Sequence, residues 1–309
     1  MPRSTRLLVE DQPTVYHVMS RTCLDGYPLG PVEKDYLLAV IKRFAGIYFC
    51  EILGFCIMGN HFHLLVRMQP EAGVSNAEVV ERYQSLYGNS EDDIPLAAHT
   101  GFIASYKKKW TSLSHLIAEI KQTFSRRYNK MNGRKGYFWG GRFTSVIVED
   151  GRTLVNCLAY IDLNPIRAGI AERPEAYRWC SLGYHLGAGN ADDLLSTDFG
   201  ISEWCEVSAS ERLRMYREYV YRTGAVDAGK GKTLDQRILE RAESKNFQYT
   251  RADRFAMRTR WFTDSAIIGS KAFVSDIANK LDLASEKRSP KRVSGLEDIF
   301  AFRRLSELL

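Results

Sequence analysis

The sequence predicts an α+β fold in which an antiparallel sheet carries helices. Three observations predict this class. Segments with two-residue alternation, which is typical of strands, recur between residues 14 and 149. Segments with the 3.6-residue period of amphipathic helices lie between them. Gly59-Asn60 joins two of the apolar segments, and a short link of this kind predicts a tight hairpin.

The first half of this pattern runs from residue 14 to residue 68. Thr14–Thr22 alternates and contains β-branched side chains, so it predicts a first strand. A helix is expected to begin at Pro31, because proline suits the first helical turn and acidic residues follow it. Ile47–Met58 and His61–Met68 are expected to form the two strands of the hairpin.

The second half runs from residue 69 to residue 164. Residues 69–109 are rich in turn formers and predict a partly helical insertion. Ser112–Tyr128 predicts a helix and Tyr137–Glu149 a fourth strand. A further helix is expected over Arg152–Asn164, because Pro165 disfavours helical geometry at the residue before it. The order βαββαβ is that of a ferredoxin-like sheet with two helices on one face, which leaves the last helix to pack near the other face.

The remaining residues differ in composition. We expect residues 1–190 to form a first domain, with residues 69–109 as an insertion, and residues 191–309 a mostly helical, basic C-terminal region. The net charge is +6, and residues 211–309 hold 21 lysines and arginines against 14 acidic residues. Such an excess favours an anionic partner, above all nucleic acid, over a merely soluble basic region. Helices are expected in this region over Glu211–Arg222, Thr233–Ser244 and Val274–Leu283.

Composition also bears on the compartment. The chain has no run of about 18 apolar residues, so we expect no membrane span and no membrane partner. No apolar stretch typical of a signal peptide is present near Met1. The six cysteines form no CxxC pair and are expected to be reduced thiols of a cytoplasmic protein.

His61 and His63 are the most informative residues of the chain. Side chains alternate along a strand, so both histidines share one face with Leu65 and Arg67, whereas Phe62 faces the core. Neutral imidazole is a common metal ligand, and the pair therefore predicts a divalent metal site. Two ligands make an incomplete site, and two exposed polar histidines are the alternative unless a third ligand is found.

The helix expected over residues 152–164 can supply that ligand. Asn156, Tyr160 and Asn164 recur every four residues and share one stripe. Tyr160 is a candidate nucleophile and Asn164 a candidate oxygen donor to the metal. A phenol has a pKa near 10, so attack at neutral pH needs a nearby cation or base. The alternative is a half-buried tyrosine and an asparagine that ends a helix before Pro165.

Four segments in this order resemble the REP-associated tyrosine transposases, relatives of the smallest insertion-sequence transposases in the HUH endonuclease superfamily. They are Met58–Val66, Gly136–Phe143, Tyr160–Gly169 and Trp179–Tyr184. The resemblance spans roughly residues 10–190. Asparagine at position 164, where the simpler enzymes often have glutamine, and the long C-terminal region favour the REP-associated branch.

The resemblance implies a chemistry for these residues. His61 and His63 match metal ligands, Tyr160 matches the single catalytic tyrosine, and Asn164 matches the residue that completes the site for Mg²⁺ or Mn²⁺. The implied activity is a single-strand DNA endonuclease and strand transferase that cleaves at or near DNA hairpins through a covalent 5′-phosphotyrosine. The expected partner is single-stranded or hairpin DNA, and a homodimer is compatible with the sequence.

Arg67, which lies on the histidine face, is expected to contact the DNA. So are arginines that lie near aromatic residues: Arg126, Arg127, Arg142, Arg254 and Arg258. Aromatic side chains can stack on bases, at roughly 1–3 kcal/mol per base. Trp139 and Phe143 are nevertheless expected to be core residues more than a stacking platform.

Two other functions remain open at this point. One is a catalytically idle, domesticated protein that only binds DNA or RNA hairpins. The four candidate site residues argue against it, because an idle site has no need of all four. The other is a nickase like a replication initiator or relaxase. A single tyrosine on a helix after the fourth strand fits that function less well.

Overall fold

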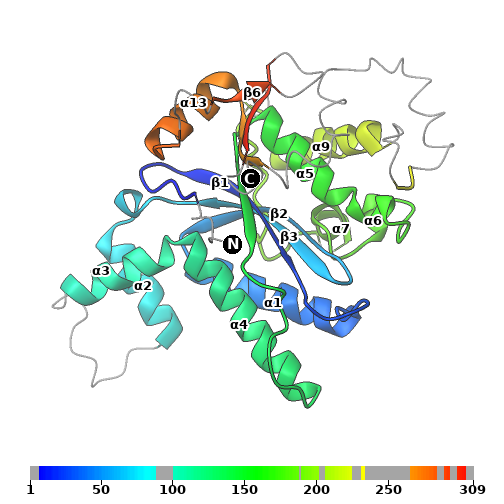
Figure 1. Ribbon diagram of the computed structural model, residues 1–309, viewed down its shortest axis with the longest axis horizontal. Coiled ribbons are helices and arrows are strands. Elements are labelled where there is room, and N and C mark those ends of the chain that lie inside the picture. Colours follow the sequence, from blue (N-terminus) through cyan, green and yellow to red (C-terminus); the bar gives the residue numbers. More distant parts are fainter. Residues whose placement is uncertain are drawn as a thin grey trace.

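The computed structural model describes residues 7–87, 100–187, 189–201, 206–224, 231–233, 265–283, 289–292 and 298–303. Its centre is a seven-stranded sheet with the order β2-β3-β1-β4-β5-β7-β6 (Figure 1). The strands are β1 (Thr14–Arg21), β2 (Cys50–Ile57), β3 (His61–Met68), β4 (Thr144–Val148), β5 (Ser265–Gly269), β6 (Lys291–Arg292) and β7 (Phe300–Arg303). The helices are α1 (Pro31–Ile47), α2 (Asn76–Tyr87), α3 (Thr100–Trp110), α4 (Leu113–Met131), α5 (Arg152–Asp162), α6 (Asn164–Arg167), α7 (Ser181–Gly187), α9 (Ala209–Gly224) and α13 (Lys271–Lys280).

The first four strands confirm the ferredoxin-like arrangement. β1 lies between β3 and β4, β2 pairs with β3, and all three pairings are antiparallel. Pro31 stands at the start of α1, as expected for a residue with a fixed φ and no N–H. Ser112 caps α4 by accepting a hydrogen bond from the backbone N–H of His115. The insertion contains α2 and α3, and β3 begins at His61 directly after the Gly59-Asn60 link.

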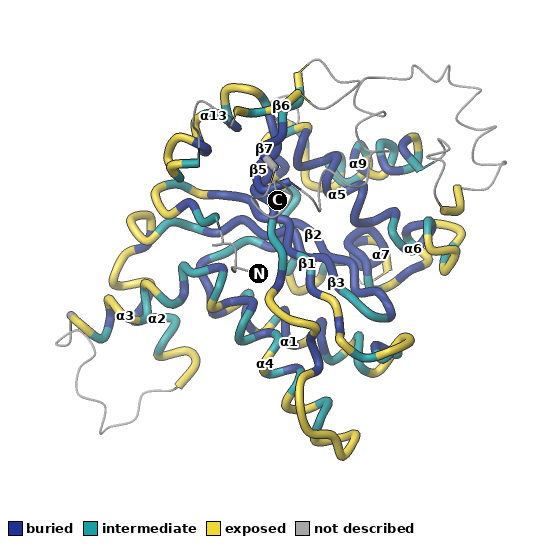
Figure 2. Tube along the Cα trace, in the orientation of Figure 1, coloured by how far each residue is buried: buried dark blue, intermediate teal, exposed yellow. Residues whose placement is uncertain are grey.

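Both faces of the sheet are buried (Figure 2). One face packs against α1, α4 and α13 around Phe62, Leu64 and Val66. The other face packs against α5 and α9 (Figure 1). The sequence correctly predicts that the helix after β4 covers the histidine face. α5 is enclosed on all sides, because every residue from Thr153 to Asp162 is buried.

Two element boundaries differ from the expected ones. β4 begins only at Thr144, because the preceding residues form a loop with positive φ at Gly136 and Gly141. Phe138 and Trp139 are buried in this loop and confirm the expectation of a core role for Trp139. α5 ends at Asp162, and the chain then makes the separate short helix α6 with Pro165 in its first turn.

The C-terminal region contributes strands that the sequence pattern did not predict. β5 pairs parallel with β4, and β7 and β6 extend the sheet further. The runs that form β5 and β7 span five and four residues, too short for periodicity to show. α9 and α13 match two of the three expected helices, whereas residues 234–244 of the third lie outside the described residues. No helix in the described ranges is long and apolar enough to cross a membrane.

Candidate active site

The two predicted histidines lie at the start of β3, on the face covered by α5. His61 is opposite Arg21 and His63 is opposite Met19 in the antiparallel pair with β1. The centroids of the two imidazole rings are 5.1 Å apart. His63 is buried and His61 is partly exposed. The alternation of β3 therefore brings both rings together, as the sequence predicts.

A third histidine, His17, which the sequence analysis did not single out, contacts His63. His17 Nε2 lies 2.9 Å from His63 Nδ1, and the two rings stack with centroids 5.1 Å apart. His61 Nδ1 donates to Asn60 Oδ1 at 2.7 Å. Both metal-ligand candidates thus use Nδ1 within the protein, which makes Nε2 the atom suited to a metal. The signal was available, because the ferredoxin-like order places the first strand, with His17, beside the third.

Both candidate ligands favour the neutral form. Burial and the nearby Arg21 lower the pKa of His61 to about 4. Burial, followed by His17, His61 and Arg21, lowers the pKa of His63 well below its usual value. Neutral imidazoles offer the lone pair that a metal needs, so the two rings are ready to bind one at neutral pH.

Tyr160 lies over the same histidines from α5. Its ring centroid is 5.8 Å from that of His63 and 6.0 Å from that of His17, in edge-on contacts. Gly54 on β2 allows α5 to approach this closely, because a Cβ at that position would be 2.0 Å from Leu158 Cδ1. The structure therefore brings the predicted nucleophile to the predicted metal ligands, although about a hundred residues separate them in the sequence.

The side chains of Asn164 and Arg167 both bind backbone carbonyl oxygens in the last turn of α5. Asn164 Nδ2 donates to the carbonyl oxygens of Tyr160 and Ile161, at 3.1 and 3.2 Å. Arg167 Nη1 donates to the same Tyr160 carbonyl at 3.1 Å, and its Cζ lies 5.3 Å from the Tyr160 ring centroid. Asn164 thus belongs to α6 and not to the helical stripe that the sequence predicts. Arg167 had no predicted role, although it stands inside the Tyr160–Gly169 motif.

The donor set fits a divalent metal in part. Among the described residues, no group of three histidine, cysteine or acidic side chains is placed to hold a metal ion. The amide oxygen of Asn164 stays a prediction as the third ligand; the Asn164 nitrogen is bound to the backbone carbonyls of Tyr160 and Ile161. Two imidazoles and one amide oxygen are compatible with Mg²⁺ or Mn²⁺, which accept oxygen ligands and retain water.

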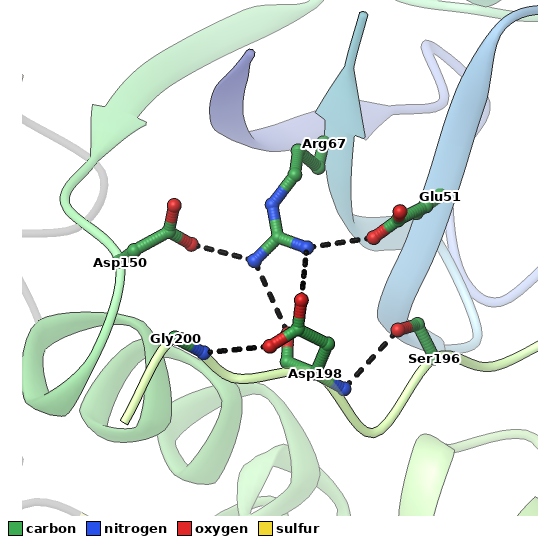
Figure 3. Close-up of polar contacts among 6 residues, drawn as sticks. All are labelled: Glu51, Arg67, Asp150, Ser196, Asp198 and Gly200. Carbon is green, nitrogen blue, oxygen red and sulfur yellow. Dashed lines mark hydrogen bonds and ion pairs between the residues drawn. The ribbon is translucent and has the colours of Figure 1, made fainter. Parts of the chain in front are cut away.

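Arg67, a predicted DNA contact, is surrounded by acidic side chains (Figure 3). Its guanidinium lies 2.6 Å from Glu51, 2.7 Å from Asp150 and 3.5 Å from Asp198. It also donates to the Asp198 carbonyl oxygen at 3.1 Å, and its side chain is only 8% exposed. These contacts tie β2 and β3 to the loop before α5 and to the segment after α7. Such an environment does not favour a phosphate contact.

Arg126, Arg127 and Arg142 are exposed on the opposite face of the sheet. A groove of about 820 Å³ between α4 and the loop at residues 136–143 is lined by Arg126 and Arg142, together with Lys121. A second groove of about 970 Å³ on the other flank of α4 is lined by Arg126 and Arg127. The loop contacts the end of β1, where Gly140 N–H donates to the carbonyl of Arg21 at 2.9 Å, and Arg21 pairs with His61. Arg254 and Arg258 lie outside the described residues.

Helix α9 fixes the outer side of α5. The Tyr216 hydroxyl donates to Asp162 at 2.6 Å, and the Tyr219 hydroxyl donates to Asn156. Asp162 also accepts from the Leu182 N–H at 3.2 Å, and its complete burial raises its pKa to about 6. Asn156, predicted to share the stripe with Tyr160, is therefore a buried contact of α9.

Comparisons with known proteins give one family match and similar solved structures. No curated protein matches the chain. A solved structure of a REP-associated tyrosine transposase bound to a REP hairpin is similar, with 15% identity and a TM-score of 0.41, over 68% of this chain and 96% of that one. Residues 14–90 match the family model of IS200-like transposases. The resemblance to the tyrosine transposases is thereby confirmed over residues 14–90, which carry His17, His61 and His63.

Proposed function

We propose that the protein is a transposase-like DNA endonuclease and strand transferase that uses Tyr160 as its nucleophile. The observation that carries this proposal is the edge-on contact between Tyr160 and His63, with ring centroids 5.8 Å apart. Tyr160 and the two neutral imidazoles lie beside two cationic side chains, Arg21 and Arg167. Such a site suits an anionic phosphodiester better than a carbohydrate or a peptide.

His61, His63 and Asn164 would hold the Mg²⁺ or Mn²⁺ ion. When bound, the ion polarises the scissile phosphate and offsets the charge that develops on it. The Tyr160 oxygen attacks phosphorus and forms the new P–O bond, the bond from phosphorus to the 3′ oxygen breaks, and the phenol proton passes through solvent to that oxygen, which leaves as a 3′-hydroxyl. The product is a 5′-phosphotyrosine, which keeps one phosphodiester bond for each bond broken. Attack by a 3′-hydroxyl reverses the step, so the same site can join DNA ends.

The exposed arginines favour DNA with a single-stranded portion. Arg126 and Arg142 line one groove with Tyr137, which is 88% exposed and available for base stacking. The loop that carries Arg142 is hydrogen-bonded to the backbone of Arg21, which pairs with His61. A hairpin on α4 with a flanking single strand along this loop would bring a phosphate to Tyr160. We also propose that the hairpin is of the REP type and that the protein is cytoplasmic.

Residues 191–309 are proposed to add DNA contacts through Arg254 and Arg258. Deletion of this region is not a clean test, because β5 and α9 from the same region pack against β4 and α5. Substitution of both arginines by glutamine in the full chain tests the contact without removing those elements.

Covalent adduct formation tests the proposal. A labelled oligonucleotide with a hairpin and single-stranded flanks is incubated with the protein and Mn²⁺, and adducts are resolved on a denaturing gel. We expect an adduct from the unmodified protein and from Tyr221→Phe, a variant outside the site, and none from Tyr160→Phe. An adduct in Tyr160→Phe of equal yield would refute the assignment of the nucleophile.

A further inference from the structure

Arg167 contacts Tyr160 in two ways. One of its nitrogens is bound to the Tyr160 carbonyl oxygen at 3.1 Å, and its guanidinium carbon lies 5.3 Å from the Tyr160 ring centroid. The residue belongs to α6, and the backbone N–H of Lys232 donates to its carbonyl oxygen at 3.1 Å. The main chain of Arg167 is thus held in place, and its side chain lies against the nucleophile.

The guanidinium has no acidic partner in the part of the chain that is described. Arg67, by contrast, pairs with three carboxylates, and Arg178 pairs with Asp35 at 2.7 Å. Burial lowers the pKa of Arg167 to about 10, which still leaves it charged at neutral pH. A partly buried cation that lacks a counter-ion is costly, and an anion bound beside it offsets that cost.

We propose that Arg167 is a phosphate-binding catalytic residue that contacts the scissile phosphodiester while it holds Tyr160 in position. The inference rests on the proposed function, because it places the reacting phosphate at Tyr160. A guanidinium suits both tasks, since it offers five donors in a planar fork and one bond to the Tyr160 carbonyl leaves the others for phosphate oxygens. Arg167 neither gains nor loses a proton in the reaction. It stabilises the charge on the non-bridging oxygens.

A lysine at position 167 could not perform both tasks equally well. An ammonium is a compact charge that lacks the planar fork, so it would satisfy the carbonyl or the phosphate with poorer geometry. The order of activity expected from this proposal is arginine, then lysine, then alanine. A purely structural role would instead follow the stability of the folded protein.

The first experiment measures the single-turnover rate of adduct formation with a labelled hairpin oligonucleotide and Mn²⁺. Loss of one donor to the developing charge typically costs about 10²–10³-fold in rate, and we expect Arg167→Ala to lose that much. Guanidinium ion added at low millimolar concentration should restore part of the rate in Arg167→Ala and leave the unmodified protein unchanged. Arg173→Ala, on an exposed arginine beyond α6, serves as the control and should retain the full rate.

The second experiment needs no cleavage. Oligonucleotides with a neutral methylphosphonate at successive positions are bound to Tyr160→Phe and to the double variants that also carry Arg167→Ala or Arg167→Lys. For Tyr160→Phe we expect one position in the oligonucleotide at which the methylphosphonate weakens binding about tenfold relative to phosphate. In the double variant with Arg167→Ala, the methylphosphonate and the phosphate at this position should bind equally well. The lysine variant retains the charge and keeps the test valid if the alanine variant is unstable.

The two proposals fail in different ways. If the unmodified protein forms no adduct with any probe, the proposed function is wrong, and the binding experiment still measures whether Arg167 senses a phosphate. An adduct in the unmodified protein, combined with an equal rate in Arg167→Ala or with unchanged methylphosphonate discrimination, would overturn the role of Arg167.

Discussion

His17 Nε2 lies 2.9 Å from His63 Nδ1, and this contact joins β1 to β3 directly beneath Tyr160. Ligand histidines usually have their second nitrogen held by a carboxylate, a carbonyl or water. Here another histidine takes that position, buried to 1% exposure. The contact occupies Nδ1 of His63 and leaves its Nε2 as the nitrogen suited to a metal.

We therefore predict that His17→Ala weakens metal binding. Loss of such a supporting contact typically costs 10- to 100-fold in metal affinity, and His17→Gln, which can still accept a hydrogen bond, should lose less. Titration calorimetry with Mn²⁺ on the DNA-free protein measures the effect. His115→Ala removes an exposed histidine on α4 and should leave the affinity unchanged. Equal Mn²⁺ affinity in His17→Ala and the unmodified protein would contradict this role.

Stability should fall in mild acid because of His185. Burial lowers the pKa of this histidine from 6.5 to about 4, so its charged form is disfavoured in the folded state. Between these pH values the unfolded chain binds a proton that the folded protein does not. The free energy of unfolding should therefore rise with pH from about 4 to 6.5 and decrease as pH falls through that window, by up to about 3 kcal/mol for this group.

Urea unfolding at several pH values checks this expectation. His185→Gln should flatten the acid slope, whereas substitution of the exposed His115 by glutamine should not. A slope as steep in His185→Gln as in the unmodified protein would assign the acid sensitivity to other groups.

Arg67→Gln should destabilise the fold without weakening DNA binding. The guanidinium is 8% exposed and pairs with three carboxylates, so its loss leaves hydrogen bonds to charged groups unmade. We expect the free energy of unfolding to decrease by about 1–3 kcal/mol. Arg178→Gln, which breaks a pair in which the arginine is 62% exposed, should cost less than about 1 kcal/mol. If folded Arg67→Gln bound DNA more weakly than the unmodified protein, the result would support the DNA contact predicted from the sequence for Arg67.

Substitution of Arg126 and Arg142 should reduce the salt dependence of DNA binding. Each phosphate contact that is lost lowers the slope of log affinity against log salt by about 1. Fluorescence anisotropy with a labelled hairpin oligonucleotide between 50 and about 200 mM salt measures this slope. We expect the double glutamine variant to bind more weakly with a flatter slope. An unchanged slope would place the DNA away from this groove.

The sequence predicts which elements and faces form this site better than it predicts the side-chain contacts within it. Alternation in residues 61–68 correctly places His61 and His63 on one face, and the βαββαβ order correctly brings Tyr160 to that face. It could not predict that α9 packs on α5 or that β5–β7 extend the sheet, because those contacts join residues far apart in the chain. Arg67 shows the limit most clearly, since alternation gives its face but not the three carboxylates that surround it.

His17 and Arg167 were missed for different reasons. His17 lies in a predicted strand and could have been paired with His63 from the sheet order alone. Arg167 depends on the end of α5 at Asp162 and on the turn into α6, which place its side chain over Tyr160. Such a local change of direction does not follow from helical periodicity.

The central claim is that Tyr160 forms the covalent bond to DNA. The chain has 16 tyrosines, and Tyr160 is the only one in the tryptic peptide from Thr153 to Arg167. After reaction with a hairpin oligonucleotide and nuclease digestion, mass spectrometry should find this peptide with a nucleotide attached through Tyr160. A nucleotide on another tyrosine, or an adduct that leaves this peptide unmodified, would contradict the account.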